Sequence, residues 1–186
     1  MKKLSKLYPT TFKKIQAAFK ILRKKNIYAQ PKALDFDSSG CQDVIFRAAK
    51  ENPSLRGGVY WNDQAEYDLD SYPIIHLGFT ACGSTLEDLE PKVLELIKIS
   101  NSMPTESEIK KIWDAREEER KKIAIEIGTE TVEALKEAGI RTTWNGCICT
   151  TIQMGLDDSK PEAARPCVCE KIWQIEFARK VEAQLG

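Results

Sequence analysis

A chain of 186 residues is long enough to bury one hydrophobic core without disulfide or metal staples. Its composition, 42% hydrophobic and 30% charged, is ordinary for a globular protein and excludes the disordered and fibrous classes. No apolar run approaches the roughly 20 residues that span a bilayer, and no apolar segment follows the basic residues 1–6. We therefore expect a cytoplasmic protein with no secretory signal and no membrane partner.

Charge is unevenly distributed along the chain. Residues 1–34 carry ten Lys or Arg and no acidic residue, whereas the rest carries the remaining 18 basic residues and all 28 acidic ones. Such a basic arm could bind nucleic acid, an anionic membrane surface or the acidic body of the protein itself, but we favour a solvated helix face. The pI of 6.6 and the lack of aromatic residues between the basic ones argue against a nucleic-acid partner.

The first half of the sequence predicts two helices and three strands. Apolar side chains recur at helical spacing between residues 12 and 22. Asp37, Ser38 and Ser39 offer N-caps for a second helix, which should end before Pro53. Short runs rich in β-branched and aromatic residues predict strands at 27–29, 59–61 and 74–81.

The second half begins with two capping-box patterns, at residues 84–87 and 105–108. Residues 106–138 favour helix almost throughout, interrupted only at Gly128-Thr129, and Gly139 suits the position after a helix end. Strands are expected at 141–144 and 147–154, joined by a type I′ turn at Asn145-Gly146. A last strand or helix is expected at 169–180.

These elements predict one α+β domain over residues 1–186, with an antiparallel or mixed sheet of about four to five strands and packed helices. The segment 83–122 is expected to be mostly helical. Because it starts from capping boxes and joins two core elements, we expect that a short loop can replace it without loss of the fold.

Four stretches resemble one known family. Residues 18–29 are similar to its opening helix and the turn into a strand, and 127–146 to its closing helix, strand and turn. Residues 39–42 resemble a Cys-Cys-Gln-x-Cys element, with Cys41 and Gln42 kept, and 60–64 an aromatic-aromatic-His-x-Gln-Asp element, with Asn62 in place of His. The family is the bacterial domain of unknown function 6891. The resemblance implies a bacterial protein in which 83–122 is a helical insertion between a core strand and a core helix. It brings no activity, and the changed motifs transfer no family-wide site.

Six cysteines occur, and the absence of an export signal predicts reduced thiols. Four of them form two Cys-x-Cys pairs, Cys147 with Cys149 and Cys167 with Cys169. On strands, residues i and i+2 share a face, so the four thiolates could hold one structural zinc ion at ~2.3 Å. The alternative is four small buried side chains that alternate inward.

Three other candidate functional groups are a histidine, an acidic loop and a tryptophan, and each also has a purely structural interpretation. The only histidine, His76, lies in an apolar strand and is expected to be a core or interface residue instead of half of a Cys–His pair. Acidic residues at 63–70 could bind a hard cation, but they lack the spacing of an EF-hand loop, so we favour a solvated loop. Trp113 is either a partner-binding anchor or the inner face of the insertion, and we favour the second.

The favoured interpretation is a non-enzymatic module, of an interaction, regulatory or immunity-like kind, that binds another protein through 83–122 or the acidic loop. The alternative is a small enzyme whose site joins Cys41-Gln42 to Asn62-Asp63-Gln64. A concave pocket that joins these residues would favour the enzyme, and a flat surface would disfavour it.

Overall fold

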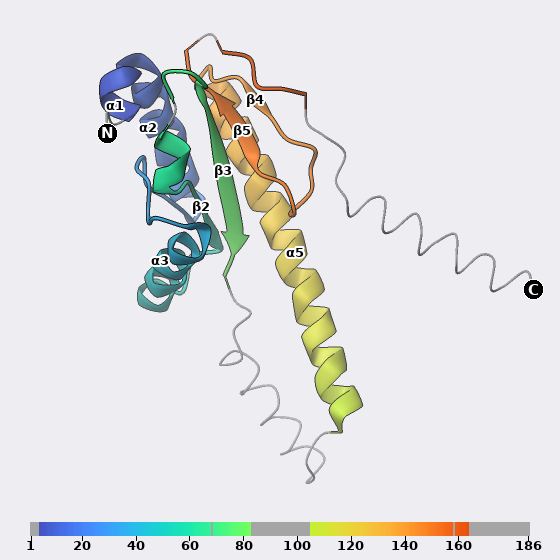
Figure 1. The fold of residues 1–186 in the computed structure, drawn as a ribbon. Coiled ribbons are helices and arrows are strands. Elements are labelled where there is room, and N and C mark those ends of the chain that lie inside the picture. The colour runs from blue at the N-terminus through green and yellow to red at the C-terminus, as the bar shows by residue number, and fades with distance from the viewer. Residues whose placement is uncertain (1–3, 68, 83–104, 158, 164–186) are drawn as a thin grey trace, which may run out of the picture.

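A five-stranded mixed sheet forms the centre of the protein in the computed structural model, which describes residues 4–67, 69–82, 105–157 and 159–163 (Figure 1). The strand order is β1-β2-β3-β5-β4, in which β1 and β2 are parallel and every other neighbouring pair is antiparallel. This confirms the predicted α+β class and mixed sheet. The strands are β1 (Ile27–Ala29), β2 (Gly57–Tyr60), β3 (Ile74–Ala81), β4 (Thr142–Thr143) and β5 (Ile152–Gly155).

The helices begin and end where local signals place them. Pro9 occupies the first turn of α2, and the side chain of Asp37 caps α3 by accepting a hydrogen bond from the Gly40 amide at 2.8 Å. No helix in the described part of the chain is both long and apolar enough to cross a bilayer. The helices are α1 (Leu4–Leu7), α2 (Pro9–Lys24), α3 (Ser38–Glu51), the 3-10 helix η1 (Asp63–Glu66) and α5 (Glu106–Glu137).

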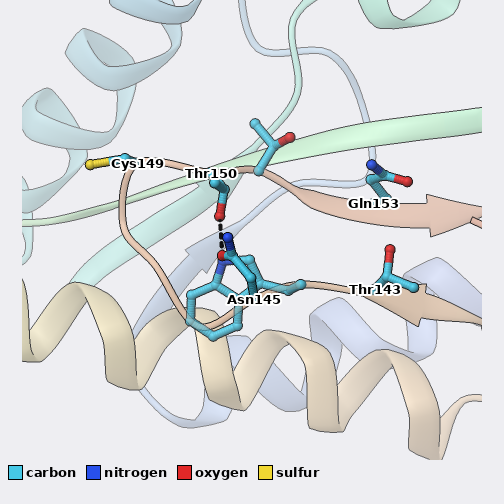
Figure 2. A pocket seen from close by; sticks show the side chains of 7 residues that line it. Thr143, Asn145, Cys149, Thr150 and Gln153 are labelled. Carbon is cyan, nitrogen blue, oxygen red and sulfur yellow. Dashed lines mark hydrogen bonds between the residues drawn. The ribbon is translucent and has the colours of Figure 1, made fainter. Parts of the chain in front are cut away.

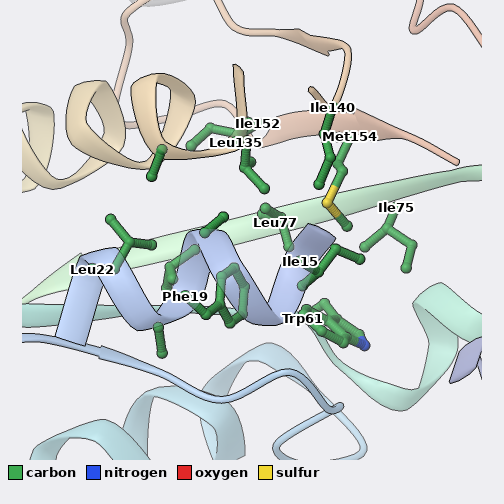
Figure 3. Close-up of a cluster of buried hydrophobic side chains, with 14 of the residues drawn as sticks. Ile15, Phe19, Leu22, Trp61, Ile75, Leu77, Leu135, Ile140, Ile152 and Met154 are labelled. Atoms are coloured by element: carbon green, nitrogen blue, oxygen red, sulfur yellow. The ribbon is translucent and has the colours of Figure 1, made fainter. Parts of the chain in front are cut away.

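The main core lies between one face of the sheet and helices α2 and α5 (Figure 3). Helix α2 buries the predicted apolar stripe, with Ile15, Phe19 and Leu22 completely inaccessible to solvent. Strand β3 contributes Ile75 and Leu77 to the same core, because alternate side chains of a strand point to one face. Each such fully buried side chain contributes about 1.5–3 kcal/mol.

The opposite face of the sheet is covered unevenly. Helix α3 packs against β2, where Cys41 and Ile45 form a second small core with Tyr60. Farther along this face, His76 on β3 is exposed, and its Nδ1 lies 3.0 Å from Thr151 Oγ1. His76 is therefore not a core residue, and the other part of the prediction, an interface histidine, stays a prediction. The alternation of β3 places His76 opposite the main core, on the part of the sheet beyond α3.

Helix α5 is one continuous element. Its predicted capping box is confirmed, since Thr105 Oγ1 accepts from the Glu108 amide at 3.3 Å and Glu108 Oε2 accepts from the Thr105 amide at 2.8 Å. The predicted helical stretch is confirmed, and α5 runs without a break through Gly128-Thr129, where the sequence favours helix least. Gly139 follows the helix with φ +73°, as predicted.

The predicted insertion at 83–122 has its C-terminal boundary, residue 122, inside this helix. Residues 106–122 are the N-terminal part of α5, which extends beyond the sheet in Figure 1 and continues into the core without a break. Residues 83–104 lie outside the part of the chain that the structure describes. The removal of the whole insertion without loss of the fold stays a prediction.

Strands β4 and β5 form the predicted antiparallel pair, but the predicted turn is wrong. Thr143 pairs with Gln153, so the connection runs from 144 to 151. A type I′ turn needs positive φ at both central residues, and only Gly146, at +80°, has it. Cys147 and Cys149 therefore lie in this loop and not on a strand.

Candidate functional site

The first predicted polar element, Cys41-Gln42, is part of the fold. Cys41 is completely buried, with its Sγ 3.5 Å from the carbonyl oxygen of Trp61, and burial raises the pKa of its thiol. A buried, protonated thiol is a poor nucleophile. Gln42 donates a hydrogen bond from Nε2 to the Tyr60 hydroxyl at 3.0 Å, which fixes α3 against β2.

The second element, Asn62-Asp63-Gln64, also has local roles. Asn62 caps η1 by accepting from the Ala65 amide at 3.2 Å, and the Asp63 amide donates to the Asp35 carbonyl at 3.0 Å. Gln64 is exposed. Neither of the two cavities described below is lined by a residue of these two elements.

The prediction of a solvated acidic loop is wrong for Glu66, because this residue is buried. One carboxylate oxygen accepts from Trp61 Nε1 at 2.9 Å and the other from the Leu4 amide at 3.3 Å. This carboxylate therefore joins η1 to the main core and to the first helix. Among the described residues there is no group of three or more His, Cys, Asp or Glu side chains that could hold a metal ion.

The first Cys-x-Cys pair lies in a hydrogen-bonded loop. Asn145 Oδ1 accepts from the Cys147 amide at 3.0 Å, and Cys147 Sγ accepts from the Cys149 amide at 3.4 Å. Cys167 and Cys169 lie outside the described residues, so the four-cysteine zinc site stays a prediction.

Two apolar side chains stand exposed on the N-terminal part of α5. Ile109 and Trp113 are 36% and 41% exposed and, four residues apart, share one face of the helix. We call residues 105–122 the α5 extension. A cavity of about 300 Å³ also lies along it, lined by Lys111, Ile112, Ala115, Arg116 and Glu119. Two neighbouring ion pairs, Arg120–Glu117 and Lys121–Glu118, both measure 2.8 Å.

A polar pocket that the sequence did not predict lies in the β4–β5 hairpin (Figure 2). We call it the hairpin pocket. Its volume is about 290 Å³, close to the lower end of the range of small-molecule sites. The only sequence signal for it was the unusual number of Thr, Asn and Gln side chains within 142–153. The lining residues are Thr143, Trp144, Asn145, Cys149, Thr150, Thr151 and Gln153.

The hairpin pocket continues a row of polar side chains across the sheet. His76 on β3 pairs with Gln153 on β5, which in turn pairs with Thr143 on β4. Directly paired residues point to the same face, so this row lies opposite the main core. Tyr72 stacks on His76, with ring centroids 6.5 Å apart.

Comparison with known proteins found no match to the chain among family models, curated proteins or solved structures. The resemblance to the domain of unknown function 6891 family therefore stays a proposal, and functional argument rests on the geometry of the described surfaces.

Proposed function

We propose that this chain is a non-enzymatic, cytoplasmic module that binds another protein through the α5 extension. The observation that carries the proposal is the exposure of Trp113 and Ile109 on a helix that continues past the sheet (Figure 1). Tryptophan is among the residues most enriched at energetic centres of protein interfaces, because it offers a large, rigid contact surface.

The charges around these side chains suit a recognition surface. The extension mixes acidic and basic residues, and its ion pairs at Glu117 and Glu118 are solvent-accessible. Exposed pairs of this kind stabilise the helix by only about 0.3–0.5 kcal/mol each. Their larger effect is on the rate and specificity of association, since rim charges steer a complementary partner.

The other predicted binding surface, the acidic segment at 63–70, fits less well. Its Glu66 carboxylate is buried against Trp61 and is not available to a partner. The proposed enzyme alternative also lacks a reactive group at its centre, because Cys41 is inaccessible and its pKa is raised. Both arguments favour the α5 extension.

The test is capture of a partner from a native bacterial lysate by the full-length chain, followed by titration of the identified protein. Trp113→Ala should weaken binding by roughly tenfold or more, the effect typical of a tryptophan anchor. Ile125→Ala is the matched control, because Ile125 is an equally exposed apolar residue on the core part of α5, at 42%. Equal affinity of the wild type and Trp113→Ala would refute the proposal.

A further inference from the structure

The hairpin pocket has a shape fixed by internal hydrogen bonds. Asn145 Oδ1 accepts from the Cys147 amide at 3.0 Å and from the Thr150 hydroxyl at 2.5 Å (Figure 2). Trp144 donates from Nε1 to the Cys147 carbonyl at 3.0 Å, and its ring meets Phe79 edge-on at 5.2 Å. A pocket held in this way needs little reorganisation when a ligand enters, which favours binding.

The lining of the pocket selects against charged ligands. Six of the seven lining side chains are hydroxyl, amide or indole groups that carry no charge, and the seventh is the thiol of Cys149. A charged ligand would lose water without gaining an ion pair, which costs far more than the transfer of a neutral polar group. The ligand that fits is therefore uncharged.

The hydrogen-bonding groups at the pocket indicate which edge the ligand presents. The hydroxyl of Thr143 donates its hydrogen to the Glu162 carbonyl at 2.8 Å, and the hydroxyl of Thr150 donates to Asn145 Oδ1 in the loop. Because both hydrogens are already donated, the two hydroxyl oxygens can only accept hydrogen bonds from a ligand. Gln153 Oε1 is buried and accepts no hydrogen bond within the described structure. An unpaired buried acceptor costs about 1–3 kcal/mol, and a ligand N–H at this position removes that cost.

We propose that the hairpin pocket binds a small, planar, uncharged ligand whose edge carries an N–H donor beside a carbonyl acceptor. The carboxamide of Gln153 complements this edge, since it offers one acceptor and one donor side by side. Trp144 supplies an aromatic wall for the plane of the ligand. Both a ring-linked carboxamide and a ring lactam, as in nucleobases, have this chemistry. The site is separate from the α5 extension and does not depend on the function proposed for it.

The test is a titration of isotope-labelled full-length protein with nicotinamide and with uracil, followed by amide and indole resonances in two-dimensional NMR spectra. The matched ligand controls are 3-acetylpyridine and 1,3-dimethyluracil, which lack the N–H donors. We expect shifts confined to residues of the hairpin pocket and a dissociation constant on the order of 1 mM for at least one of the two amides. The amide that binds distinguishes a carboxamide from a lactam ligand.

Two variants test the role of Gln153. Gln153→Met removes the donor and the acceptor at similar size and should weaken binding by roughly tenfold, the equivalent of two lost hydrogen bonds. Gln64→Met makes the same change at an exposed position and should leave binding unchanged. The proposal is overturned if neither amide binds, if the controls bind as tightly as the amides, or if Gln153→Met binds like the wild type. If Gln153→Met does not fold, the comparison of amides with their controls still decides.

Discussion

Replacement of Gly128 by alanine tests a close contact between α5 and the β4–β5 hairpin. On an open helix face this change would stabilise the protein by about 1 kcal/mol, because glycine is the weaker helix former. Here the added Cβ would lie 2.6 Å from Cη2 of Trp144 and 2.9 Å from its Cζ2. The indole cannot retreat freely, because its Nε1 bonds to the Cys147 carbonyl and its ring packs on Phe79.

Overpacking at such a contact costs about 1–3 kcal/mol, so after the gain in helix propensity we expect Gly128→Ala to destabilise the protein by about 1 kcal/mol. In a Trp144→Leu background the obstructing ring is gone, and the same change should stabilise by about 1 kcal/mol. Urea unfolding followed by far-ultraviolet circular dichroism measures both differences. An increase in the free energy of unfolding when Gly128→Ala is made in the wild type would show that the contact is not this close.

Three further predictions concern the charge of Glu130, the buried carboxylate of Glu66 and the predicted zinc site. Burial alone would raise the pKa of Glu130, but its hydrogen bond and charge interaction with Arg56 outweigh burial and hold the pKa below the usual 4.5. The stability that this gives is present above that value and is lost as pH falls through the lowered pKa, so the deficit of Glu130→Gln in urea unfolding should be clear at neutral pH and shrink as the pH falls below 4.5; a deficit that does not change with pH would contradict it. Glu66→Ala should cost about 2–3 kcal/mol by leaving Trp61 Nε1 unpaired, whereas Glu66→Gln, which can still accept that bond, should cost much less. Protein purified without added zinc should carry about one zinc per chain, and Cys149→Ser should lose it, if the four-cysteine site exists; substoichiometric zinc in the wild type would rule the site out.

The sequence was sufficient for the elements that short-range interactions control. The stripe at Ile15, Phe19 and Leu22, the Asp37 cap and the capping box at Thr105 all depend on residues within about one helical turn. The alternation in β3 likewise assigns its side chains to the two faces of the sheet, but it does not say which face is covered by helices. The sequence therefore left open whether His76 is a core or an interface residue, and the structure shows that it is exposed on the face opposite the main core.

The tertiary structure decided everything that depends on partners far apart in the chain. At Gly128, α5 leaves room for the ring of Trp144, a close approach that the local sequence does not reveal. The burial of Cys41 between α3 and β2 and of Glu66 beside Trp61 made both candidate groups parts of the core. The hairpin pocket exists because the register of Thr143 with Gln153 leaves a long loop, and strand register is set by packing against the whole sheet and not by the Asn-Gly dipeptide alone.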